Sequence, residues 1–178
     1  MIEKTLLKML NEQIKHEMES YYIYLSMVAY FHSLSLDGMA HWMRCQAHEE
    51  MEHTMKFFDH IIDRGENVTL LDIKQLKTSW ISPLEAWEDA LKHEEFISDK
   101  IRNLMKITRE VMDYSAEPLL NWFIKEQIEE EANAGKNVEQ MKLVGDEKQA
   151  LLLLDRELAA RPFPAGSPLN PLTYRGVE

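Results

Sequence analysis

The sequence predicts an all-α fold: a four-helix bundle with one long crossover, a short fifth helix and an extended C-terminal tail. Two observations carry this prediction. Glycine and proline number only six each among 178 residues, so the segments between their few clusters are long. Within these segments apolar residues recur at steps of three and four, the period of an amphipathic helix. We expect residues 1–160 to form one bundle domain and residues 161–178 a proline-rich tail.

The first two predicted helices are joined by a short turn. The first runs from about Glu3 to His32 and the second from about Asp37 to Arg64, where Gly65 is a good C-terminal stop. Because only about four residues join them, we expect antiparallel neighbours. A link of roughly 17 residues follows, long enough to run the length of the bundle. Within it, residues 67–73 could lie extended, the one weak strand-like pattern.

Capping and proline signals predict where the remaining three helices begin and end. Ser82-Pro83-Leu84-Glu85 has the form of a capping box, with Ser as N-cap, and starts a third helix that reaches about Val111. Ser115 can cap a fourth helix, which has Pro118 in its first turn and ends near Gly145. The fifth segment spans about Asp146 to Ala160 and ends before Pro162.

The charge balance excludes several classes of function. There are 20 Lys and Arg against 31 Asp and Glu, a formal net charge of −11, so nucleic acid and anionic membranes would repel the protein. The chain has no signal-peptide core at its start and no apolar run of about 18 residues. The single cysteine, Cys45, rules out an intrachain disulfide and fits a reducing compartment. We expect a cytoplasmic protein with a cationic ligand.

Each of the four long helices carries at least one residue of a type that can bind a metal, or hydrogen-bond beside it, at a position where the helical period predicts an apolar residue. We call these the ligand-type residues. They are Glu17 in the first helix, Glu50 and His53 in the second, Glu94 in the third, and Gln127 and Glu130 in the fourth. Each lies near the middle of its helix, and the middles of antiparallel helices lie at the same height. We therefore expect these side chains to converge in the core.

The cost of burying carboxylates favours a metal site. An unpaired buried carboxylate costs several kcal/mol or takes up a proton, and a central pair of cations removes that cost. Glu50 and His53, at i and i+3, can reach one ion from the same helix face. Glutamates with a Glu-x-x-His motif form di-iron bundles, and ligands dominated by oxygen favour iron or manganese over zinc. A protonated carboxylate network without metal is the alternative.

These residues also resemble a known family. Glu17 with Tyr24 seven residues later, the segment Glu49-Glu50-Met51-Glu52-His53, Glu94, and the segment 126–130 resemble the non-haem bacterial ferritins, over about residues 1–160. The resemblance implies a homo-oligomeric, hollow 24-subunit cage for iron storage and detoxification. It also implies a ferroxidase that oxidises Fe(II) with O2 or H2O2 and stores Fe(III) mineral. A reductase partner would release the iron.

The resemblance implies roles for individual residues. Glu17, Glu50 and His53 would form a first iron site; Glu50 as a bridge, with Glu94 and Glu130, would form a second, beside a hydrogen-bonding Gln127. Glu49, Glu126 and Glu129, with Glu130 shared, would form a third site nearer the cavity. Tyr24 and Trp122 would be an aromatic pair able to donate electrons, with core packing as the alternative for both.

Some positions depart from related patterns. Bacterioferritins carry a second Glu-x-x-His on the fourth helix, where this chain has Gln127 and Glu130, so we expect the second iron to be held more loosely. Met51 follows Glu50, as the haem-ligating methionine of bacterioferritins does, but we interpret it as a packing residue and expect no haem. Glu117 lies where ferritins line three-fold channels with carboxylates.

Three other classes of protein fit the sequence less well. A rubrerythrin-like di-iron peroxidase would bring two Glu-x-x-His motifs and a cysteine-rich iron domain, which one cysteine cannot supply. A DNA-protecting mini-ferritin would place its metal site between subunits. A non-catalytic helical scaffold would not tolerate the buried carboxylates without compensation.

Overall fold

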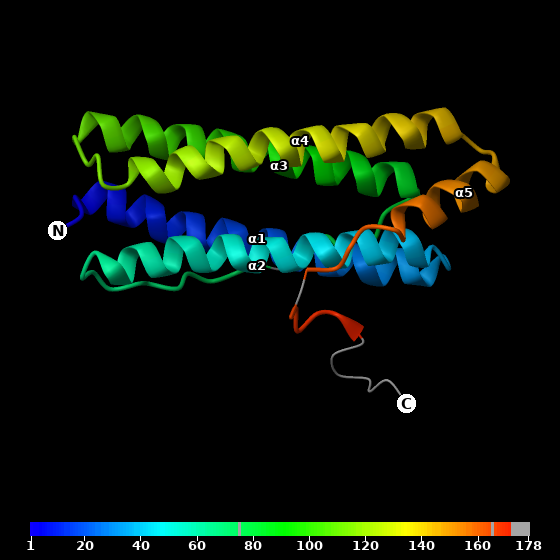
Figure 1. Ribbon diagram of the computed structural model, residues 1–178, viewed down its shortest axis with the longest axis horizontal. Helices are drawn as coiled ribbons and strands as arrows, with labels where there is room; N and C mark the ends of the chain where they lie inside the picture. Colours follow the sequence, from blue (N-terminus) through cyan, green and yellow to red (C-terminus); the bar gives the residue numbers. More distant parts are fainter. Residues whose placement is uncertain (75, 165, 172–178) are drawn as a thin grey trace.

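The computed structural model describes residues 1–74, 76–164 and 166–171. Over these residues the chain forms the predicted all-α bundle, and no strand is present in them (Figure 1). The helices are α1 (Lys4–Ser33), α2 (Asp37–Asp63), α3 (Pro83–Glu110), α4 (Glu117–Val144) and α5 (Lys148–Leu158). Helices α1 and α2 form one antiparallel pair and α3 and α4 the other, while α5 covers the end of the bundle where α4 ends. None of the helices described is long and apolar enough to cross a membrane.

The start of α3 follows the prediction. The Ser82 hydroxyl oxygen accepts a hydrogen bond from the Glu85 backbone N–H at 3.1 Å. The Glu85 carboxylate accepts from the backbone N–H of Ile81 at 2.6 Å, one residue before the N-cap. The box therefore closes one residue earlier than in its standard form, but it still satisfies two backbone donors.

The predicted cap of α4 is wrong. The N-cap is Ala116, and no side chain caps the helix. The chain enters α4 through a tight backbone turn, in which Ala116 N–H donates to Asp113 O at 3.1 Å and Glu117 N–H to Tyr114 O at 3.3 Å. Because Ala116 is already in the helical region and fully buried, the turn leaves no capping place for Ser115. Helix α5 begins two residues later and ends two residues earlier than predicted.

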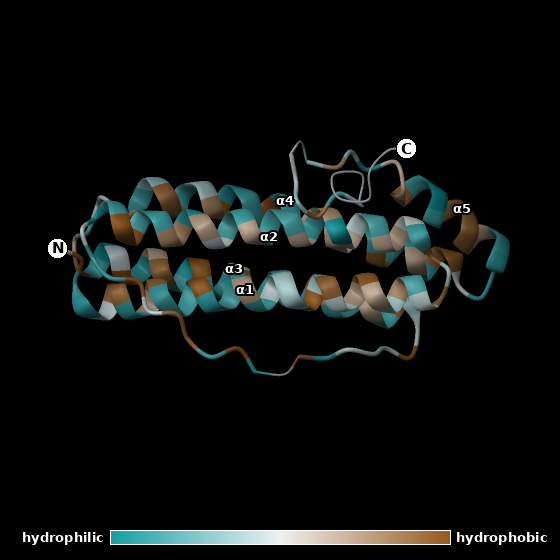
Figure 2. Cartoon of the chain, turned by 90° about the horizontal axis from the view of Figure 1, so that it is seen from below, coloured by the Kyte–Doolittle hydropathy of each residue, from teal (hydrophilic) through white to brown (hydrophobic). Residues whose placement is uncertain are grey.

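The link between α2 and α3 runs along the bundle for most of its length (Figure 2). The backbone N–H of Thr69 donates to the Asn11 side-chain oxygen at 2.6 Å, and that of Ile2 donates to Glu66 at 3.1 Å. Val68 packs against the apolar residues beneath it. These contacts fix the link to α1 at the level where an extended segment was expected.

The apolar core is divided into two clusters. One contains Phe31, Trp42 and Trp87 toward the α5 end, and the other contains Phe57 and Phe123, whose rings stack with centroids 4.2 Å apart. On each of the four long helices the ligand-type residues fall between the two clusters in sequence. A polar layer thus interrupts the core at one height, as the helical period predicts.

Helix α5 docks on the start of α2 through backbone contact. The side chain of Asp155 accepts a hydrogen bond from the Met39 backbone N–H at 2.8 Å. A Cβ placed on Gly38 would lie 1.7 Å from the backbone oxygen of Asp155. Only glycine permits this approach, so Gly38 determines where α5 lies.

The described part of the tail returns along α2. Its expected extended course is interrupted by backbone turns that end at Ser167 and Asn170. The ring of His41 contacts Arg161 O at 2.7 Å, and that of His48 contacts the Ser167 hydroxyl at 2.8 Å. The rest of the predicted tail, residues 165 and 172–178, lies outside the described residues.

Candidate metal centre

The four long helices bring their ligand-type residues together in the core. Glu17 of α1, Glu50 and His53 of α2, Glu94 of α3, and Gln127 and Glu130 of α4 are all at most 5% exposed. Each replaces an apolar residue in the stripe that its helix turns inward. The polar layer therefore contains four carboxylates and one imidazole, and within the described residues no arginine or lysine hydrogen-bonds to these four carboxylates.

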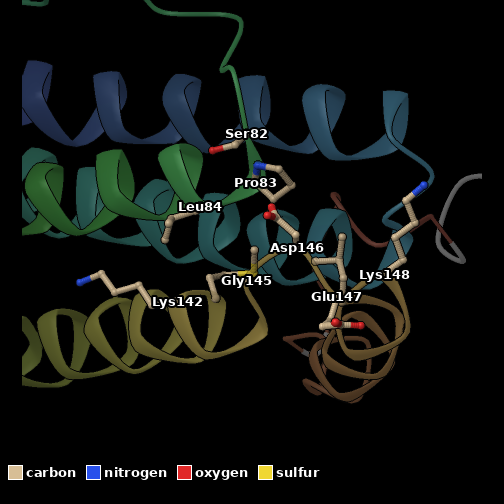
Figure 3. Close-up of a pocket in the computed structure, with 10 residues that line it drawn as sticks. Ser82, Pro83, Leu84, Lys142, Gly145, Asp146, Glu147 and Lys148 are labelled. Atoms are coloured by element: carbon tan, nitrogen blue, oxygen red, sulfur yellow. The ribbon is translucent and has the colours of Figure 1, made fainter.

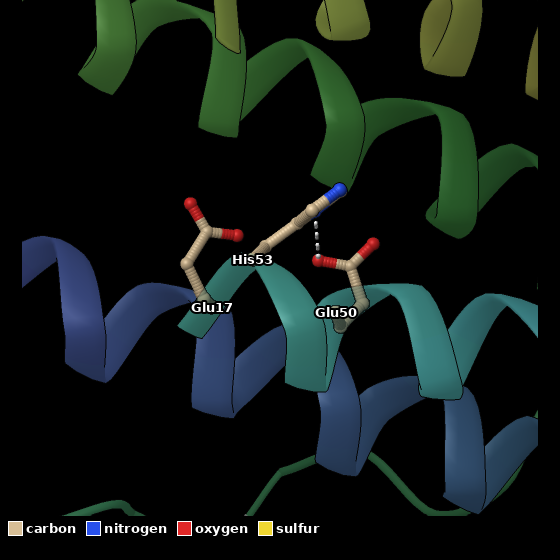
Figure 4. Close-up of side chains that lie close together, drawn as sticks. All are labelled: Glu17, Glu50 and His53. Atoms are coloured by element: carbon tan, nitrogen blue, oxygen red, sulfur yellow. Dashed lines mark ion pairs between the residues drawn. The ribbon is translucent and has the colours of Figure 1, made fainter. Parts of the chain in front are cut away.

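Glu17, Glu50 and His53 form a close group in which all three side chains are buried (Figure 4). One ligand atom from each lies within 4.8 Å of the others, and the His53 Nδ1 is 3.4 Å from a Glu50 oxygen. The Glu17 Oε1 accepts from the Gln13 amide at 2.8 Å, whereas the buried Oε2 has no hydrogen-bond partner. A buried carboxylate oxygen without a donor is costly, and a cation between these three side chains would satisfy it. The residues present therefore fit a metal ion.

The other two carboxylates are held by hydrogen bonds. The Tyr24 hydroxyl donates to Glu94, and the Gln127 amide donates to the other Glu94 oxygen at 3.2 Å. The Gln46 amide donates to both Glu130, at 2.8 Å, and Glu50, at 3.1 Å. Glu94 is thus oriented from α1 and α4, and Glu130 from α2.

Burial makes the centre a strong acceptor of cations. Desolvation, with repulsion from the neighbouring carboxylates, raises the pKa of Glu17, Glu94 and Glu130 to about 8. The pKa of Glu50 is raised as well, by burial first and by Glu130 next. In the absence of metal these carboxyls therefore favour their protonated form at neutral pH, and an incoming cation would replace the protons.

The predicted third-site residues are only partly brought together. Glu126 offers a ligand atom within 4.8 Å of His53 and Glu130. Glu49 and Glu129 belong to neither three-residue group found among the described residues. Glu129 is exposed, and Glu49 forms an ion pair with Arg161 at 2.6 Å.

Both members of the aromatic pair lie beside the centre. Tyr24 is buried against Glu94, and burial raises its pKa well above the usual range, so it remains a donor. Trp122 contacts His53 edge to face, with ring centroids 5.6 Å apart, and is 37% exposed. Met51 is half-buried on α2. The expectation that Met51 is a packing residue and that no haem binds stays a prediction.

A surface hollow at the end of the bundle takes no part in this centre. It lies where the turn between α4 and α5 faces the start of α3 (Figure 3). Ser82, Pro83, Gly145 and Asp146 are among the residues that line it, and none of the buried glutamates is. The hollow is therefore separate from the polar layer in the core.

Sequence reasoning missed three residues that hold the centre. Gln13 and Gln46 each stand four residues before a buried glutamate on the same helix face, and this i, i+4 spacing could have identified them. Arg161 donates to Gln46 Oε1 at 3.1 Å from 115 residues away in the chain. No local pattern could have predicted that contact.

Comparison with known proteins identifies relatives over most of the chain. A family model described as "Ferritin-like domain" matches residues 7–144. The protein named "Bacterial non-heme ferritin" of Staphylococcus saprophyticus is 38% identical over 163 residues, 92% of this chain and 98% of that protein; that of Staphylococcus epidermidis is 39% identical with the same coverage. An open-pore ferritin structure from Archaeoglobus fulgidus is 40% identical, with a TM-score of 0.89, over 91% of this chain and all of that chain.

Proposed function

Because the chain belongs to the ferritin family, we propose that it stores iron by oxidising Fe(II) to Fe(III) at its buried carboxylates. The mineral would be held in the cavity of a 24-subunit cage, like the cages of the family that the sequence resembles. The observation that carries the proposal is the group Glu17, Glu50 and His53, with a buried Glu17 oxygen that has no donor.

The substrate ions would bind in the polar layer. Glu17, Glu50 and His53 hold the first Fe(II), and Glu50, Glu94 and Glu130 hold the second. Binding displaces the protons that burial keeps on these carboxyls. Hard anionic oxygen ligands stabilise Fe(III) relative to Fe(II), which favours loss of an electron from each ion.

The electron balance requires two ions in one site. Two Fe(II) supply two electrons, and with two protons these reduce one O2 to H2O2; a hydrogen peroxide molecule as oxidant would accept two electrons and, with two protons, give two waters. Tyr24 orients Glu94 through its hydroxyl and is a reserve electron donor next to the site. Gln127, in place of a fifth carboxylate, orients Glu94 and leaves the second ion less tightly held.

Oxidised iron then leaves toward the cavity. Glu126 lies beside His53 and Glu130 and is the first carboxylate on the outward route, followed by Glu49 and Glu129. The looser second position favours passage of iron to the mineral over retention as a permanent cofactor.

A matched pair of substitutions tests this function. Glu94→Gln removes a carboxylate of the centre, while Glu95→Gln removes an exposed one next to it. After addition of two Fe(II) per subunit in air, stopped-flow absorbance of the ferric product should show a fast phase that Glu94→Gln slows at least about tenfold and Glu95→Gln leaves unchanged. Equal rates in both variants and the unsubstituted protein would exclude a ferroxidase centre in this layer and favour the non-catalytic helical scaffold.

A further inference from the structure

The first residue of the C-terminal tail places a cation against the carboxylates of α2. Arg161 follows α5, and one of its guanidinium nitrogens (Nη2) donates to Glu49 Oε2 at 2.6 Å. The other terminal nitrogen (Nη1) donates to Gln46 Oε1 at 3.1 Å and to Trp42 O at 3.3 Å. The guanidinium carbon lies 4.3 Å from the centre of a Trp42 ring. Four contacts with three residues on one helix face hold this cation in one place.

Gln46 connects the guanidinium to the metal centre. Because its oxygen accepts from Arg161, its amide nitrogen faces inward, where it donates to Glu50 and Glu130. The positive charge is thus one side chain away from two of the carboxylates proposed to hold iron. Arg161 itself forms no hydrogen bond or ion pair with the buried glutamates, so it acts on the centre through Gln46.

The same guanidinium occupies the outward route. Glu49 is proposed to receive iron as it leaves the centre, yet one of its oxygens is bound to a fixed positive charge. A di- or trivalent cation approaching Glu49 meets that charge at contact distance and must displace it. Glu126 has no such partner among the contacts described, so Arg161 blocks the outward route at Glu49 and not at Glu126.

We propose that Arg161 is a gate residue, an inference that rests on the proposed function. Its guanidinium fills the outer cation position at Glu49. Each subunit is thereby limited to two bound metal ions until the guanidinium moves away. The tail then regulates how iron passes from the centre to the mineral. Arg161 is a positioning residue, since it contacts ligands and not the reacting ions.

Metal-binding stoichiometry tests the gate without any redox reaction. Zn(II), which does not change oxidation state, is titrated calorimetrically into the assembled, metal-free protein. The unsubstituted protein should bind two ions per subunit. Arg161→Met removes the charge but keeps much of the side-chain length, and it should reveal a third ion whose affinity rises at least tenfold. Arg161→Lys keeps the charge and should stay at two.

Two further variants test whether the third ion binds at Glu49 and appears because of Arg161. Arg156→Met removes an exposed arginine from the same end of the chain and should leave two ions bound. Adding Glu49→Gln to Arg161→Met should abolish the third ion if it binds at Glu49. A stoichiometry of two in Arg161→Met, or a third ion that survives Glu49→Gln, would overturn the gate. Fewer than two ions in the unsubstituted protein would instead refute the proposed metal centre.

Discussion

Replacing Glu17 by glutamine should stabilise the metal-free protein at high pH, although it removes a proposed ligand. Burial raises the pKa of Glu17 from 4.5 to about 8, and each pKa unit corresponds to about 1.4 kcal/mol. Keeping this carboxyl ionised above pH 8 therefore costs on the order of 5 kcal/mol of folding free energy. A neutral glutamine does not incur that cost and can keep the hydrogen bond from Gln13.

The sign of the pH dependence follows from the raised pKa. The folded protein binds this proton more tightly than the unfolded chain, so the contribution of Glu17 to stability is complete below about pH 4.5 and is lost as pH rises toward 8. The glutamine variant should be within about 1 kcal/mol of the unsubstituted protein near pH 5 and exceed it by about 3–5 kcal/mol near pH 9.

Urea unfolding followed by circular dichroism, in the presence of a chelator and at several pH values, measures this difference. Glu12→Gln is the matched control on α1, because Glu12 pairs with Lys8 at 3.7 Å on the solvent side and should change stability by less than about 0.5 kcal/mol at any pH. If the difference between Glu17→Gln and the unsubstituted protein did not change with pH, the carboxyl would not be a buried, desolvated group and the reasoning would fail.

Three other substitutions test separate parts of the structure. Tyr24→Phe removes the hydroxyl that donates to Glu94; it should lower the free energy of unfolding by about 1 kcal/mol and slow iron oxidation several-fold in stopped flow. Gly38→Ala drives a Cβ into the Asp155 backbone and should cost about 1–3 kcal/mol in urea unfolding, with faster amide hydrogen exchange in α5. Ser82→Ala removes the α3 cap and should lower the same free energy by about 1 kcal/mol, without any effect on oxidation.

The predictable parts of the fold are those that depend on local pattern. The stripe that includes Phe57 and Ile61 on α2, and the one that includes Val138 and Met141 on α4, are buried as the helical period indicates. Because ligand-type residues interrupt those same stripes, helical periodicity alone predicts the polar layer. Gly65, with φ of +74°, lies just after α2 as expected of a helix stop.

The parts that could not be predicted depend on contacts between distant segments. Ser115 has the chemistry of a cap, but a backbone turn determined by the α3–α4 connection takes its place. The composition of the tail indicates an irregular chain. It does not indicate that Arg161 reaches Glu49, which lies 112 residues away in the sequence. Whether Glu94 points to Tyr24 or to a neighbouring glutamate likewise depends on helix rotation, which sequence periodicity determines only to within part of a turn.

The most direct test of the central claim is to locate the metal. Crystals of the protein soaked with Fe(II) without oxygen can be measured on both sides of the iron absorption edge, and anomalous difference maps show iron alone. We predict two peaks per subunit, one between Glu17, Glu50 and His53 and one between Glu50, Glu94 and Glu130. Absence of iron from the polar layer, with peaks only at surface carboxylates, would contradict the claim.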